Sequence, residues 1–190
     1  MRSLVISLKA LLFFTVVTGV VYPLLITGIA RGVFPEKANG SLVIKENRIT
    51  GSELIGQQFE SEKYFTSRPS SISYNPLPSG GSNYGLTNAK LKQQVEERRQ
   101  RFAEFNQMED GTAIPADMLF ASASGLDPHI SRQAALLQVN RIAKARNFSE
   151  AQKQKLSACV DILTEGPQLR VLGEERVNVL LLNLEVDKIK

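Results

Sequence analysis

The strongest constraint on the fold is an uncharged run of 21 residues near the N-terminus, Ala10–Ala30 (ALLFFTVVTGVVYPLLITGIA). As an α-helix rising about 1.5 Å per residue, this run extends about 31 Å, close to the roughly 30 Å hydrocarbon core of a bilayer. The alternative is a cleaved signal peptide, whose apolar region usually spans only about 7–15 residues. Ile29-Ala30-Arg31 is also a poor cleavage site. We therefore expect an uncleaved transmembrane helix at residues 10–30.

The charges that flank this run set its expected orientation. Arg2 and Lys9 precede it without an acidic residue, and two basic residues follow it closely, so the positive charge is nearly balanced. The bias toward a cytoplasmic N-terminus is therefore small. Because nearly all of the chain follows the helix, we expect a short cytoplasmic tail at residues 1–9 and an extracytoplasmic domain at residues 31–190.

Small residues recur along the predicted helix at every fourth position: Thr15, Gly19, Pro23 and Thr27. Such a face lets a second helix approach closely within lipid, where large apolar side chains have no advantage over the acyl chains. The alternative is that glycine and proline are simply frequent in membrane helices. We predict that this face packs against a partner helix.

The charge of the predicted domain argues against nucleic acid as a partner. Residues 31–190 hold 21 of the 23 basic residues and all 19 acidic residues, a net charge of only +2. Nucleic-acid binding requires a much stronger basic surface. The single cysteine, Cys159, cannot form an internal disulfide.

Hydrophobic periodicity predicts an α+β domain. Residues 41–59 have the pattern of two strands joined by a turn. Three helices follow, of which the first begins at Ala89 and carries Leu91, Val95, Phe102 and Phe105 on one face. For the second, Ser131 is the expected N-cap, Asn147 the end, and Ala135, Val139 and Ile142 the inner face.

The third helix and the C-terminus complete the predicted domain. Ser149 and Gln152 form a capping box that opens the third helix, and Gly166-Pro167 is its expected end. Residues 169–173 and 177–186 (VNVLLLNLEV) are rich in branched apolar residues and are predicted to be strands.

Between the strands and the helices lies a long segment with little periodicity, residues 64–88 (YFTSRPSSISYNPLPSGGSNYGLTN). Its aromatic and branched residues argue against disorder. Irregular loops of this length are usually functional when they are ordered. We predict an ordered surface loop that makes contacts.

The segment SASGLDPHIS, residues 122–131, holds the only histidine, His129, close to Ser122, Ser124 and Asp127. These residue types suggest a serine hydrolase in which His129 activates a serine. The nucleophile-elbow pattern G-x-S-x-G is absent, and triad members usually come from distant parts of a chain. We keep a membrane-anchored hydrolase that uses Ser124 or Ser122 as the alternative function.

Other chemistry finds less support. One histidine and one cysteine 30 residues apart do not suggest a zinc site, so we expect no metal. The glycine-rich SGGSNYG at 79–85 lacks the Gly-Lys-[Ser/Thr] of a phosphate-binding loop. We instead predict a tight turn that uses the freedom of glycine at positive φ.

A structural or interface role is the physical favourite for residues 122–131. Gly125 permits an unusual backbone conformation, Pro128 fixes φ, and Ser131 caps the following helix. Asp127 and His129 are expected to pair with each other or with backbone groups.

The motifs together resemble the family of the C subunit of the bacterial Kdp potassium-transporting ATPase (KdpC). The matching stretches are VYPLLITGIA at 21–30, GSELIGQQF at 51–59, YFTSRPSS at 64–71, YNPLPSGGSN at 74–83, TN at 87–88, SASGLDPHIS at 122–131, QVNRIAKAR at 138–146 and LGEERVNVLLLNLEVD at 172–187. The chain departs from the family pattern at Leu86 and Arg132, which affects only local backbone geometry.

The resemblance implies a non-catalytic, single-pass subunit of a K⁺ importer in the bacterial inner membrane. Its implied partners are a channel-like K⁺-translocating subunit and a P-type ATPase subunit. The family's C subunit is described as a catalytic chaperone that raises the ATPase subunit's affinity for ATP, which calls for a ternary complex with the nucleotide. It implies no cofactor of the chain's own, because the complex handles ATP and K⁺.

The family supplies no catalytic residues to transfer. Besides the small face of the helix, we expect the partner-contact or structural loops to use Asn75, Gly80, Gly81, Asn83, Asp127 and His129.

Overall fold

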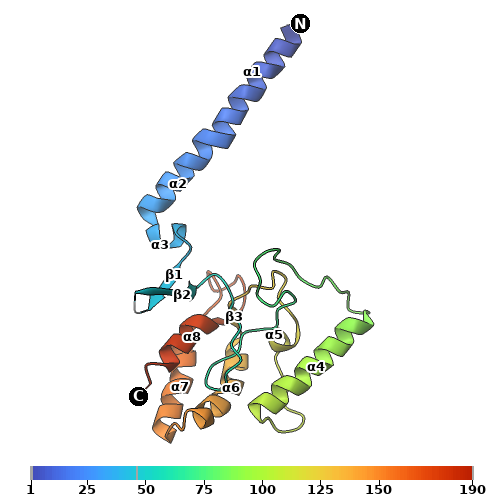
Figure 1. Cartoon of the computed structure of the whole chain (residues 1–190), viewed down its shortest axis with the longest axis vertical. Helices are drawn as coiled ribbons and strands as arrows, with labels where there is room; N and C mark the ends of the chain where they lie inside the picture. The colour runs from blue at the N-terminus through green and yellow to red at the C-terminus, as the bar shows by residue number, and fades with distance from the viewer. Residues whose placement is uncertain (1, 46, 190) are drawn as a thin grey trace. The chain divides into compact units, whose positions relative to one another are not determined.

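The computed structural model describes residues 2–45 and 47–189 (Figure 1). The chain forms two compact units, Met1–Ser52 and Glu53–Lys190.

The first unit is dominated by a helix of 32 residues, Arg2–Val33, in three parts. These are α1 (Arg2–Val16), a π-helical segment (Val17–Val21) and α2 (Tyr22–Val33). The helix has a mean hydropathy of 2.3 and none of its apolar window is buried. Within the described residues it is the one helix long and apolar enough to span a membrane, as predicted, although it begins earlier and ends later than residues 10–30.

The π-helical segment ends at Val21, two residues before Pro23 in the first turn of α2. Proline has no backbone N–H, so it cannot donate to the preceding turn, and a π-helical turn is one way for a helix to accommodate this. A short helix, α3 (Pro35–Ala38), follows.

The first unit ends in an antiparallel hairpin of β1 (Leu42–Lys45) and β2 (Arg48–Ser52). Its register shifts between Val43 and Ile44, as in a β-bulge. The predicted strand–turn–strand pattern is confirmed here.

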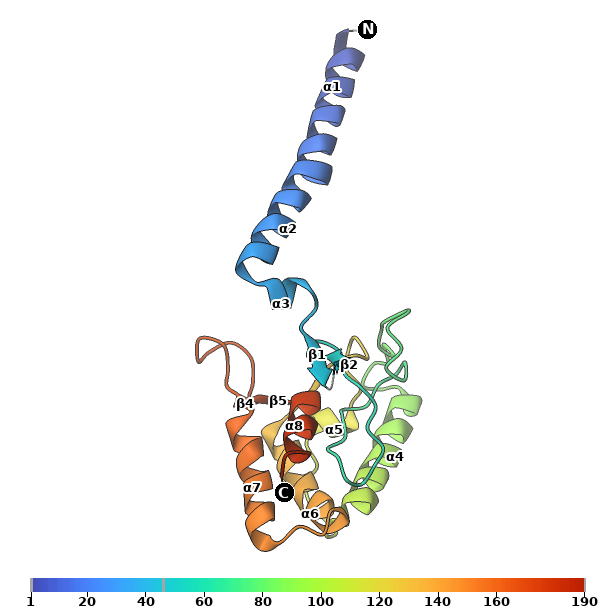
Figure 2. The ribbon, with the colours of Figure 1, turned by 60° about the vertical axis from the view of Figure 1, so that its left-hand side comes forward.

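The second unit is α+β, as predicted. A three-stranded antiparallel sheet has the order β3-β5-β4. The strands and helices of this unit, seen from two sides in Figures 1 and 2, are β3 (His129–Ile130), β4 (Thr164–Glu165), β5 (Arg176–Asn178), α4 (Ala89–Asn106), α5 (Ala116–Leu119), α6 (Arg132–Ala145), α7 (Glu150–Ile162) and α8 (Val179–Val186).

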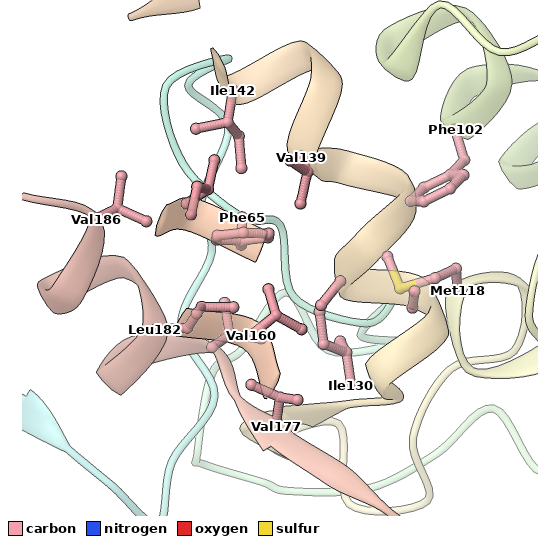
Figure 3. Close-up of a cluster of buried hydrophobic side chains, with 14 residues drawn as sticks. Phe65, Phe102, Met118, Ile130, Val139, Ile142, Val160, Val177, Leu182 and Val186 are labelled. Atoms are coloured by element: carbon pink, nitrogen blue, oxygen red, sulfur yellow. The ribbon is translucent and has the colours of Figure 1, made fainter. Parts of the chain in front are cut away.

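The core of this unit gathers side chains from α4, α6, α7, α8, the sheet and the irregular segment (Figure 3). Phe65, Ile142 and Leu182 are fully buried. The predicted inner face of α6 is confirmed, since Ala135, Val139 and Ile142 all belong to the core. Phe65 comes from the segment 64–88, so the core itself holds the start of that segment in place.

The predicted helix caps form. The Ser131 hydroxyl accepts a hydrogen bond from Ala134 N at 3.1 Å and caps α6. Ser149 and Gln152 form the predicted reciprocal capping box at the start of α7. These caps satisfy backbone N–H groups that have no partner within the helix.

The C-terminal strand prediction is wrong for most of residues 177–186. β5 ends at Asn178, whose side chain accepts from Leu181 N at 3.2 Å and thereby caps α8. A short apolar run does not by itself distinguish a buried strand from a buried helix. Here the asparagine cap and burial on several sides of α8 favour the helix.

Two further expectations near the C-terminus are corrected. The third helix ends at Ile162 rather than at Gly166-Pro167, because Thr164 and Glu165 pair with β5 as β4. Residues 169–173 form no strand but an exposed loop, closed by a single bridge between Gln168 and Leu172.

Candidate functional site

The two motif segments predicted to make contacts pack against each other. Gly80 N donates to Ser124 O at 2.9 Å, and Ser122 N donates to Pro69 O at 3.2 Å. Ser70 Oγ donates to Gly125 O at 2.7 Å. Residues 122–131 are therefore held by residues 64–88 through main-chain hydrogen bonds, and the two segments form one ordered surface.

We call the region where residues 122–131 meet residues 64–88 the junction. Close approach of neighbouring parts of the chain explains most of the glycines in and beside it. A Cβ on Gly56 would lie 2.6 Å from Asp127 O, and one on Gly81 would lie 3.1 Å from Ala123 O. Gly125 has φ +71°, and its Cβ would lie 2.4 Å from the Ile72 side chain. The prediction of an unusual backbone at Gly125 is confirmed.

The predicted use of positive φ by Gly80 and Gly81 is wrong. Among the described residues of SGGSNYG, the one with a left-handed backbone is Asn83, at φ 54°. Gly81 is instead required where its backbone passes close to Ala123. Asn75 has a local role, because its Oδ1 accepts from Leu77 N at 3.0 Å.

The polar centre of the junction is Asp127, whose carboxylate contacts the side chains of Arg68 and His129. Arg68 Nη1 lies 2.7 Å from Asp127 Oδ2, and His129 Nδ1 lies 3.2 Å from Asp127 Oδ1. The backbone N–H of His129 also donates to Asp127 Oδ1 at 3.0 Å. The predicted pairing of Asp127 with His129 is thus present, and Arg68 is a partner that sequence analysis did not identify.

These contacts determine the charge state of Asp127. Burial acts to raise its pKa, but hydrogen bonds from His129 and Arg68, with the positive charge of Arg68, outweigh that effect and hold the pKa at about 2. The Tyr74 hydroxyl donates to the backbone carbonyl oxygen of Arg68 at 2.5 Å and so helps to hold the main chain at Arg68. Burial raises the pKa of that hydroxyl, although a hydrogen bond with Ser67 and the charge of Arg68 act against it.

An open pocket of about 700 Å³ lies beside this junction and is lined by Arg68, Asp127 and His129, among others. Asp117, at its edge, accepts from Ser131 N at 2.7 Å and from Ser131 Oγ at 3.1 Å. Its carboxylate therefore stabilises the N-terminus of α6. The pocket gives Asp127 and His129 a solvent-facing side on which a partner's polar groups can bind.

The serines of this segment have other partners than the histidine. Ser124 Oγ accepts from Leu126 N at 3.1 Å, and Ser122 is buried. In the part of the chain that the structure describes, neither serine forms a hydrogen bond with His129. The structure thus places a carboxylate next to His129 but no serine nucleophile within hydrogen-bonding distance. No three acidic, histidine or cysteine residues in residues 2–45 and 47–189 are placed to hold a metal ion.

A buried polar network, which sequence analysis missed, fixes the start of the segment 64–88. Asn183 Oδ1 accepts from Phe65 N at 2.7 Å, and Gln138 Oε1 accepts from Thr66 N at 2.8 Å. Arg141, only 3% exposed, donates to Gln138 Oε1 at 2.9 Å and to Glu62 O at 2.5 Å. The signal available in the sequence was the occurrence of polar Gln138 and Arg141 among the core positions of α6.

The small-residue face of the membrane helix crosses the π-helical segment. Gly19 lies within that segment, where an added Cβ would meet no atom within 4 Å, and Thr27 Oγ1 donates to Pro23 O at 2.7 Å. A π-helical turn takes more residues than the 3.6 of an α-helical turn. The wider turn therefore brings residues four apart closer to one face.

Comparison with known proteins gives similarity over nearly the whole chain. The family model described as "K+-transporting ATPase, c chain" matches residues 4–188. A protein of Leptospira interrogans is 45% identical over 182 residues, which cover 96% of this chain and 92% of the relative. A protein of Dechloromonas aromatica is 48% identical over 187 residues, which cover 97% of this chain and 95% of the relative. Both carry the name "Potassium-transporting ATPase KdpC subunit".

Proposed function

Because the chain belongs to the KdpC family, the c chain of K⁺-transporting ATPases, we propose that it is a subunit without chemistry of its own in a complex that imports K⁺ at the expense of ATP. Its proposed partners are a channel-like subunit that conducts K⁺ and a P-type ATPase subunit. In this role the chain assembles the complex and raises the affinity of the ATPase subunit for ATP.

The observation that carries the proposal is the interlocking of the two motif segments around Arg68, Asp127 and His129. A surface held by main-chain hydrogen bonds, glycine contacts and an ion pair is ordered before a partner binds, which lowers the entropic cost of association. The predicted contact residues Gly80, Gly81 and Asp127 lie at this junction.

The helix supplies the second proposed contact. A single apolar helix with Gly19 and Pro23 on one face fits close packing against a partner's transmembrane helix. We place the N-terminus in the cytoplasm and residues 31–190 outside it. In that orientation the domain lies across the membrane from cytosolic ATP, so any effect on nucleotide affinity passes through the partners' helices.

Purification tests the subunit role. The tagged chain is isolated in mild detergent from its native host, grown at limiting K⁺, and the eluate is assayed for partner subunits and K⁺-stimulated ATPase activity. We expect to recover a P-type ATPase and a channel-like protein with the chain. Recovery of the folded chain alone, in good yield, would contradict the proposal.

A titration of ATP tests the regulatory part. The ATPase activity of the purified complex is measured against ATP concentration with the chain present and after its removal or omission. We expect the KM for ATP to rise when the chain is missing. The same KM for ATP in the presence and absence of the chain would contradict the proposed effect on nucleotide affinity.

A further inference from the structure

A groove of about 520 Å³ lies along α4 and shares Ser70 and Tyr74 with the polar junction. Its helical wall carries Arg98, Arg101, Phe102 and Phe105, and its opposite wall is formed within residues 58–74. Phe102 and Met118, which also line it, belong to the edge of the hydrophobic core (Figure 3).

Two arginines and one carboxylate line this groove, so the charged side chains of its lining carry a net positive charge. Arg98 and Arg101 are three residues apart on α4 and therefore lie on the same face of the helix. In the described part of the chain neither forms a salt bridge. The one acidic residue of the lining, Glu60, accepts a hydrogen bond from Gln58 Nε2 at 2.5 Å.

The position of Arg98 is fixed by the fold. Its Nη1 donates to Leu119 O at 2.9 Å, which holds the guanidinium between α4 and α5. Burial lowers the pKa of Arg98, and the positive charge of Arg101 lowers it further, against an opposing effect of Glu97. An anion bound between the two guanidinium groups would offset this repulsion.

Aromatic side chains adjoin the two charges. Phe105 on α4 and Tyr74, Phe59 and Pro69 from residues 58–74 all line the groove. A concave site with apolar walls and a few convergent charged groups is the usual form of a small-molecule site. The apolar walls here favour a ligand that carries an apolar group next to its charge.

We propose that this groove binds a small organic anion, a phosphate ester or a comparable acid. The charged group lies between Arg98 and Arg101, and the apolar part lies against Phe105 and Tyr74. All residues that line the site belong to this chain, so binding to it can be tested without the partner subunits.

The test uses 4-fluorophenyl phosphate, which combines an aromatic ring with a phosphate. Binding to the full chain in phosphatidylcholine nanodiscs is followed by the broadening of the ligand's ¹⁹F signal, with empty nanodiscs as the blank. We expect saturable binding that weakens as salt is added, and at least tenfold weaker binding to Arg98→Gln and to Arg101→Gln. Uncharged 4-fluorophenol should bind far more weakly than the ester.

A matched control is available on the same helix. Arg99 lies 3.5 Å from Glu96 and does not line the groove, so Arg99→Gln should bind the probe like the wild type. Circular dichroism of each variant checks that the fold is retained. Absence of saturable binding, or equal losses in Arg99→Gln and the two groove variants, would overturn the proposal.

A second arm identifies where such an anion comes from. Phosphatidic acid, which also presents a phosphate ester, is added to the nanodiscs. Displacement of the probe by this lipid, but not by free inorganic phosphate, would support the site and assign it to a lipid headgroup. Displacement by inorganic phosphate alone would support the site and assign it to a soluble ester.

Discussion

Two irregular segments of the second unit differ in how they are held. Residues 64–88 are fixed by buried Asn183 and Gln138, by main-chain hydrogen bonds to residues 122–131, and by Phe65 in the core. The loop 166–175 is closed by one bridge, and its large apolar side chains are exposed, with Leu169 at 87% and Val171 at 81%. The comparison shows that absence of helix or strand does not mean absence of order: polar anchors and close glycine contacts give the first segment a defined conformation.

The largest expected effect comes from removing the buried guanidinium that anchors the first segment. Arg141→Met leaves Glu62 O and Asn106 Oδ1 without their donor, so we expect the free energy of unfolding to fall by about 3 kcal/mol. Thermal or urea unfolding of the full chain in detergent micelles measures it. Arg132→Met on the same helix is the control, because its ion pair with Asp161 is exposed and is worth about 1 kcal/mol or less. Equal losses in the two variants would contradict the anchoring role of Arg141.

A matched pair of glycines compares the two segments directly. Both Gly125 and Gly173 have positive φ, but a Cβ on Gly125 would meet Ile72 at 2.4 Å and Gly80 O at 3.0 Å, whereas a Cβ on Gly173 would meet nothing within 4 Å. We expect Gly173→Ala to cost about 1 kcal/mol for backbone strain alone and Gly125→Ala to cost about 2–3 kcal/mol. The same unfolding measurement distinguishes them. Similar costs at both positions would show that residues 64–88 do not constrain residues 122–131.

The ion pair at the junction should make stability depend on pH in the acidic range. The Asp127 pKa lies at about 2, below its ordinary value of 3.8, so its contribution is fully present above about pH 4 and is lost as the pH falls toward 2. For this partly exposed group the contribution is about 1–2 kcal/mol. Unfolding of the wild type and Asp127→Asn at several pH values from 6 to 2 should show the difference between them shrinking on acidification. A difference that stays constant over this range would rule out the ion pair as its source.

Local signals in the sequence were sufficient for most helices and for the hairpin, and insufficient for the junction. The caps Ser131 and Ser149, the apolar run and the core face of α6 depend on residues within a few positions of one another. The Arg68–Asp127 contact joins residues 59 apart, and the close approach of Gly56 to Asp127 depends on tertiary packing. The C-terminal helix was missed for a different reason, because its apolar run suits a strand and a helix equally well and only the role of Asn178 as an N-cap distinguishes them.

The smallest expected effect on stability belongs to the loop 166–175. Leu169→Ser removes an apolar side chain that is already 87% exposed, so we expect the free energy of unfolding to change by no more than about 0.5 kcal/mol. Leu156→Ser, at a fully buried core position, is the destabilising comparison. If the loop 166–175 is a contact surface, a partner subunit covers Leu169 when the complex assembles. Leu169→Ser should then lower the yield of partner subunits in the purification described above. Unchanged stability with unchanged recovery of the partners would assign no contact role to Leu169, and a large loss of stability would show that the loop is packed more tightly than its exposure indicates.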